Sequence, residues 1–176
     1  MPQSNTVING IYLPSAGLGN ATSETQFNGS NAALLTCIVP GTSKLKNRPF
    51  TVRVAGRVTG GTTTNFTLKV YWGTSSTIGS NTQLATSGAI AVNSVSANFD
   101  VTLVLMWDAT SQKIQGRFSG QMNNSLVAAA ALSNAVSSVD LTAGETSTVG
   151  LTATGLFSAS NASNTAIIDV FEIDVD

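Results

Sequence analysis

The sequence contains no histidine and only one cysteine, Cys37, among its 176 residues. Histidine is the commonest general base and a common zinc ligand, so its absence excludes Ser-His-Asp and Cys-His catalysis within one chain. A single thiol forms neither an internal disulfide nor a thiolate cluster. Cys37 lies in the apolar run LLTCIVP, which favours a buried, inert thiol over a nucleophile.

Charged residues are also scarce, at 10% of the chain, whereas an ordinary soluble domain holds roughly 25%. The surface must therefore be built largely from Ser, Thr, Asn, Gln and Gly, and such a surface dissolves less reliably than a strongly charged one. This composition favours a protein that is packed against neighbours, with a secreted protein as the alternative.

Long apolar segments and phosphate-binding loops are absent as well. No segment approaches the ~18 apolar residues that span a bilayer, and no GxxxxGK[ST] loop occurs. The first apolar run is short and lacks a basic start, so we expect no secretory signal. We therefore expect no membrane partner, no cofactor and no enzymatic activity.

The few charges are unevenly distributed. Residues 1–117 hold all 8 basic residues and three of the 9 acids, and residues 118–176 hold the other six acids. Such asymmetry can indicate nucleic-acid binding, but we expect the charges to pair between early and late strands, or between subunits. Residues 166–174 are predicted to pair with residues 50–58, bringing Arg53 or Arg57 close to Glu172 or Asp174.

The acids of the terminal segment IIDVFEIDVD are the best remaining candidates for chemistry. Strand alternation places Asp169 and Phe171 on one side of the strand. It places Glu172, Asp174 and Asp176 on the opposite side. These three carboxylates could bind a hard cation such as calcium, but no ligand loop organises them, so a solvated strand face is favoured. A glycosidase that uses Asp108 or Glu172 is the third and weakest functional hypothesis.

Strand signals dominate from residue 34 onward. PFTVRVAGRVTGG and TNFTLKVYWG alternate, and their inward positions are predicted to be Phe50, Val52, Val54, Val58, Phe66, Leu68 and Val70. Seven or eight such strands with closely spaced turns predict an all-β fold, a jelly-roll-like antiparallel β-sandwich, over residues 34–176. Residues 1–33 are read as an extended N-terminal arm, with anchors at Ile8, Ile11, Tyr12, Leu13 and Phe27.

The segment TLVLMWDATSQKIQGRF predicts a β-hairpin. Its first strand places Phe99, Val101, Leu103, Leu105 and Trp107 on one face. The other face carries Val104 and Met106, so we expect the second half of this strand to be covered on both sides. The alanine-rich SLVAAAALSNAVSS that follows is expected to form a short helix or an apolar loop pressed on a neighbour.

Two further features suggest binding. The basic loop residues Lys44, Lys46 and Arg48 lack interleaved aromatic residues, so an acidic patch on a protein neighbour is a better target than nucleic acid. Tyr71 and Trp72 end a strand beside a glycine. Exposed there, they could stack on sugar rings, as in a carbohydrate-binding module; core packing is the alternative.

Three stretches carry a resemblance to a known group of proteins: GRVTGGTTTNFTLKVYWGTSSTIGSNTQLATSGAIAV, LVLMWDATSQKIQGRFSGQMN and LFSASNASNTAIIDVFEIDVD. Together they span about residues 50–176 and resemble β-sandwich virion proteins of tailed bacteriophages, including capsid decoration (cement) proteins. The shared features are a glycine-flanked YWG strand, a WDATSQKIQG hairpin and a turn leading into the final DVFEID strand. The match is one of pattern rather than of a diagnostic motif, and a carbohydrate- or receptor-binding β-sandwich module of a phage tail or fibre is the alternative function.

The resemblance implies a non-enzymatic jelly roll that trimerises and sits where capsomers meet, often with an N-terminal arm. The expected partners are the major capsid protein or other virion proteins, and a second copy of the chain. The expected location is the exterior of the capsid, after synthesis in the host cytoplasm. The residues expected at the partner interface are Ile11, Tyr12, Leu13, Lys44, Lys46, Arg48, Leu126, Val127 and Leu132.

Overall fold

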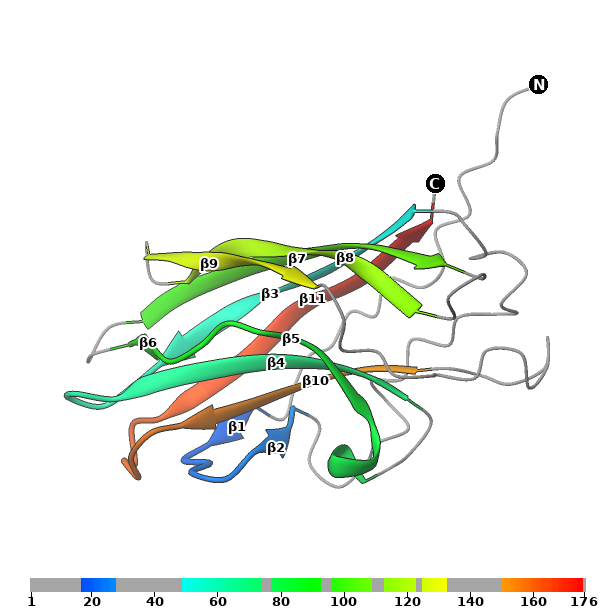
Figure 1. Cartoon of the computed structure of the whole chain (residues 1–176). Coiled ribbons are helices and arrows are strands. Elements are labelled where there is room, and N and C mark those ends of the chain that lie inside the picture. The colour runs from blue at the N-terminus through cyan, green and yellow to red at the C-terminus, as the bar shows by residue number, and fades with distance from the viewer. Residues whose placement is uncertain are drawn as a thin grey trace.

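The computed structural model describes residues 17–27, 49–73, 77–92, 96–108, 113–122, 125–132 and 150–175. Within these ranges the chain forms two antiparallel sheets that pack face to face, with a single short 3-10 turn at Ile78–Ser80. Figure 1 shows the sheets as two layers. The predicted all-β sandwich is therefore confirmed.

The larger sheet has the strand order β1-β11-β3-β7-β8-β9. Its strands are β1 (Leu18–Gly19), β3 (Pro49–Thr59), β7 (Ser96–Asp108), β8 (Lys113–Met122), β9 (Ser125–Leu132) and β11 (Thr165–Val175). The terminal strand β11 pairs with β3, as predicted from the charge distribution. Strands β7, β8 and β9 follow one another as a meander.

The smaller sheet has the order β2-β10-β4-β5, and β6 pairs with β4 outside this path. Its strands are β2 (Thr25–Gln26), β4 (Asn65–Gly73), β5 (Thr82–Thr86), β6 (Ile90–Ala91) and β10 (Gly150–Phe157). The chain passes between the sheets from β3 to β4 and back from β10 to β11. These two crossings bring the strand pairs β3–β11 and β4–β10 together.

Aromatic and branched side chains fill the space between the sheets. All seven positions predicted to face inward on β3 and β4 are buried, and so are Phe99, Val101, Leu103 and Leu105 on β7. Phe66 lies at the centre, with ring centroids 6.4 Å from Phe27, 6.3 Å from Phe99 and 5.0 Å from Phe157. Strand alternation therefore identified this part of the core correctly.

The alanine-rich segment is a strand over Ser125–Leu132, so both the helix and the loop expected there are wrong for these residues. Strand β9 pairs with β8 through registers such as Arg117↔Ala131 and Gly116↔Leu132. The helix preference of alanine amounts to less than about 1 kcal/mol per residue. A helix this short is marginal alone, and the backbone hydrogen bonds offered by β8 outweigh the preference.

Two short segments of the predicted arm form strands, one in each sheet. Strand β1 pairs with β11, and β2 pairs with β10. Phe27 is buried in the core, which agrees with docking on the domain, one of the two roles expected for it. The other expected anchors, from Ile8 to Leu13, lie outside the described residues.

Two arginines on the outer face of β3 pair with acids on the adjacent strands. Arg53 donates hydrogen bonds to Asp100 on β7, and Arg57 donates to Asp169 on β11. Arg53 also lies opposite Glu172 in the register with β11, as expected. The acids that accept these hydrogen bonds are nevertheless not Glu172 and Asp174, the two that were predicted to lie close to the arginines.

The position of Asp169 differs from the prediction because β11 is irregular there. The register with β3 shifts between Ile168 and Val170, which leaves Asp169 as an extra residue in a β-bulge. Ile168 and Phe171 are both buried, whereas Asp169 lies beside Arg57 on the outer face. The bulge therefore reverses the side that uninterrupted alternation assigned to Asp169.

Glu24 connects residues 17–27 to the smaller sheet. Its carboxylate lies 2.7 Å from Lys69 Nζ on β4 and accepts a 2.8 Å hydrogen bond from Thr154 Oγ1 on β10. Burial alone would raise the pKa of Glu24, but hydrogen bonds from Lys69, Tyr71 and Thr154, together with the Lys69 charge, outweigh it and lower the pKa. The hydrogen bond to Glu24 raises the pKa of Lys69.

We expect Glu24→Gln to lower the free energy of unfolding by about 1 kcal/mol at neutral pH, since hydrogen bonds to charged groups contribute on this scale. Because the folded pKa of Glu24 is lowered, its stabilising effect is complete above the unfolded pKa of about 4.3. The effect is lost as the pH falls through the folded pKa. Urea melts at pH 7 and pH 3 should show the two proteins converging in acid; an equal difference at both values would contradict this.

Candidate interaction surface

The outer face of β7 carries the two large apolar side chains that are exposed in the described part of the chain. Val104 has 49% of its surface exposed and Met106 has 41%. The sequence led us to expect both sides of this half-strand to be covered, either by the second sheet or by another subunit. The described part of the chain leaves Val104 and Met106 exposed, and cover by another subunit stays a prediction. The inner face packs into the core through Leu103 and Leu105, while the outer face is open.

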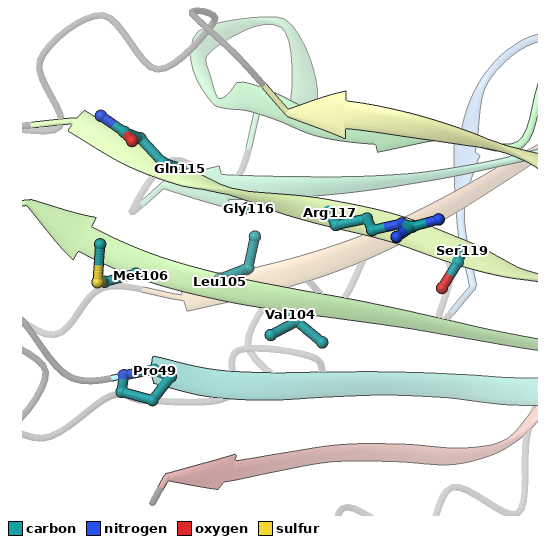
Figure 2. Close-up of a pocket in the computed structure, with 8 residues that line it drawn as sticks. All are labelled: Pro49, Val104, Leu105, Met106, Gln115, Gly116, Arg117 and Ser119. Atoms are coloured by element: carbon teal, nitrogen blue, oxygen red, sulfur yellow. The ribbon is translucent and has the colours of Figure 1, made fainter.

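A hollow of about 520 Å³ lies over this part of the sheet. Figure 2 shows Val104 and Met106 on β7 between Pro49 at the start of β3 and the residues of β8. The residues that line it are Pro49, Val104, Leu105, Met106, Gln115, Gly116, Arg117 and Ser119. We call these residues the β7–β8 patch. It is an open, mainly apolar surface with one basic side chain, Arg117.

Close approach of two strands shapes the floor of the patch. A Cβ atom added to Gly116 would overlap the backbone carbonyl oxygen of Val104 and lie 2.9 Å from Leu105 Cα. Only glycine leaves room for the two backbones at this point. Gly116 therefore lets β8 lie close against β7, and the next residue, Arg117, lies directly across from Val104 in the register.

Arg117 differs from the other cations whose side chains the structure describes. Lys69 pairs with Glu24, Arg53 with Asp100 and Arg57 with Asp169. Arg117 is exposed and makes no ion pair or hydrogen bond with another described residue. An isolated cation next to exposed apolar side chains is suited to a carboxylate on another molecule.

The aromatic residues considered for sugar stacking are largely removed from solvent. Trp72 is 0% exposed and packs 6.1 Å from the ring of Phe50 in the core. Tyr71 is 7% exposed on the opposite side of β4, and its hydroxyl oxygen lies 3.3 Å from Gln83 Oε1. Neither ring presents an open face, so the stacking role is not available to them in this fold.

The predicted interface residues fall into two groups. Ile11, Tyr12, Leu13, Lys44, Lys46 and Arg48 lie outside the described residues. Leu126, Val127 and Leu132 lie on β9, the strand at the end of the larger sheet next to β8. This group of predicted residues therefore lies on the strand next to β8, which contributes residues to the β7–β8 patch.

Acidic residues do not gather into a metal-binding cluster in the described ranges, where no group of three His, Cys, Asp or Glu residues is suited to hold an ion. Glu172 and Asp174 both lie on the outer face of β11. No helix in the described part of the chain has the length and apolar character needed to cross a membrane.

Sequence reasoning identified Val104 and Met106 as unusual but did not single out Arg117. The signal for Arg117 was present, because it lies opposite Val104 in the predicted hairpin. What the sequence could not supply was the pairing of the other arginines. Only that pairing distinguishes Arg117 from Arg53 and Arg57.

Comparison with known proteins shows no matching family model and no matching curated protein. One solved structure that aligns is described as a conserved carbohydrate esterase from the Shiga toxin-encoding bacteriophage phi24B. The alignment has 12% identity and a TM-score of 0.31, and it covers 87% of this chain and 74% of that one. A likeness this weak carries no inference about the fold or the activity of this chain.

Proposed function

We propose that this chain is a structural virion protein that binds and stabilises a bacteriophage capsid as a decoration protein, and that it acts as a trimer on the capsid exterior. The observation that carries the proposal is the exposed, mainly apolar β7–β8 patch, which lies on a sandwich with few charged residues. An exposed apolar surface beside a cation that pairs with no described residue supports binding to another protein.

The energetics of repeated contacts support such a role. Burying apolar surface stabilises an interface by about 25 cal/mol per Å², and a specific interface buries about 1,600 Å² in total. When a subunit makes several such contacts at once, modest individual affinities combine into strong attachment. A protein of this kind needs no catalytic group, and we propose that it is not an enzyme.

The test is quantitative mass spectrometry of purified virions of the phage that encodes the chain. The proposal predicts a fixed copy number per particle that is a multiple of three and scales with the number of capsomer junctions. Absence from virions, or a few copies confined to isolated tails, would contradict the decoration role.

A further inference from the structure

We propose that the β7–β8 patch is covered by a second copy of this chain, with Asp174 on strand β11 of that copy meeting Arg117. The inference rests on the proposed trimer, for which it names the contact between subunits. Three observations on the larger sheet lead to it, and each concerns the outer face that Figure 2 shows in part.

The first observation is a single row of side chains that crosses four strands. Asp174 on β11 lies opposite Thr51 on β3, Thr51 opposite Val104 on β7, and Val104 opposite Arg117 on β8. The adjacent row contains Pro49, Met106 and Gln115. The apolar part of the patch therefore lies between an acid at one side and a base at the other.

The second observation is that this acid and this base are too far apart to pair within one chain. Neighbouring strands lie about 4.8 Å apart, so three intervals separate the backbones of Asp174 and Arg117 by roughly 14 Å. Both side chains are exposed, and neither makes an ion pair with a described residue. Their opposite charges are complementary when the Arg117 side of one copy meets the Asp174 side of another.

The third observation is the contrast with the rest of the same face. Arg53 and Arg57 are already neutralised by Asp100 and Asp169 through paired hydrogen bonds. Glu172 also lies on this part of the face, opposite Arg53 in the register. Arg117 and Asp174, which pair with no described residue, lie at the other end, on either side of the exposed Val104 and Met106.

A contact in which Arg117 and Asp174 of each copy meet different neighbours is heterologous, and a threefold rotation closes it into a trimer. Each subunit of a trimer would offer its Arg117 side to one neighbour and its Asp174 side to the other. The apolar side chains would supply most of the affinity, because an exposed ion pair contributes little. The ion pair would fix the orientation, because juxtaposed like charges disfavour other arrangements.

Charge reversal tests this contact in the full chain. Arg117→Glu and Asp174→Lys each place like charges together, and each should raise the protein concentration at which the trimer dissociates about tenfold or more. The double variant restores an opposite-charge pair and should return this concentration to near the wild-type value. Light scattering over a dilution series measures all four proteins.

Two controls accompany the charge reversals. Asn98→Asp changes an exposed residue at the other end of β7 and should leave the dissociation concentration unchanged. Circular dichroism and thermal melts should show that every variant is folded, since both reversed residues are exposed. A further test is the double substitution Val104→Thr with Met106→Gln. It makes the outer face of β7 polar while leaving the strand able to fold, and it should also dissociate the trimer.

The outcomes separate this inference from the proposed function. If both single variants remain trimeric, or if the double variant is not restored, the contact between Arg117 and Asp174 is wrong even where virions contain the protein in fixed copy number. A wild-type chain that is monomeric also overturns the inference. The virion copy number then decides the decoration role by itself.

Discussion

Replacing Phe66 by alanine is expected to lower the free energy of unfolding by about 3–5 kcal/mol, the range for large-to-small changes of buried aromatic residues. Phe66 is fully buried, and its ring contacts those of Phe27, Phe99 and Phe157. These rings come from the N-terminal segment and from both sheets. A cavity at this point therefore weakens every layer of the sandwich at once.

Urea or thermal unfolding of the full chain measures the effect. A total stability of about 5–15 kcal/mol is usual for a domain, so the variant should melt far below the wild type. Phe66→Leu keeps more of the volume and should lose less. A loss under about 1 kcal/mol in the alanine variant would mean that Phe66 does not lie at the centre of the core.

Gly56→Ala is expected to be destabilising by about 3 kcal/mol, at or above the upper part of the range for overpacked cores. An added Cβ would overlap the carbonyl oxygen of Ile167 on β11 and lie 2.6 Å from Phe99 Cζ. The overlapped atom belongs to the backbone, so no side-chain rotation relieves it. The substitution would push β3 and β11 apart beside the bulge that places Asp169 next to Arg57.

Gly19→Ala is the matched control, because an added Cβ at Gly19 meets nothing within 4 Å. It should leave the free energy of unfolding within about 0.5 kcal/mol of the wild-type value, as surface substitutions usually do. Equal stability of the two variants would contradict the close approach of β3 and β11 at Gly56.

Strand alternation predicted most of the fold because the sandwich has one buried side per strand. On β3 and β4 every second residue from Phe50 to Val54 and from Phe66 to Val70 is large and apolar, and each is buried. The pairing of β11 with β3 followed from the opposite charges on the two segments. Local pattern and long-range charge thus pointed to the same arrangement.

Features that depend on neighbouring strands escaped the sequence. The bulge at Asp169 appears in the pairing with β3, beside the close approach of Gly56 to Ile167, and neither can be read from the spacing of residues on one strand. The strand at Ser125–Leu132 depends on the free edge of β8 rather than on alanine's own preference. Tyr71 is covered on the outer side of its sheet through contacts with Glu24 that no spacing in the sequence reveals.

The candidate surface was predictable in part. The apolar outward positions Val104 and Met106 follow from alternation, but their exposure depends on whether other parts of the chain cover them. Arg117 becomes informative only when the other cations are seen to be paired. Such a surface can be recognised only in the folded structure, where some charged side chains have no ion-pair partner and some apolar side chains stay exposed.

Sedimentation of the purified 18.0 kDa chain with capsids assembled without it tests the central claim most directly. We predict saturable binding, with the protein pelleting at a fixed ratio to the capsid protein and raising the temperature at which the shells rupture. Protein that stays in the supernatant at every concentration, with no change in shell stability, would contradict the account.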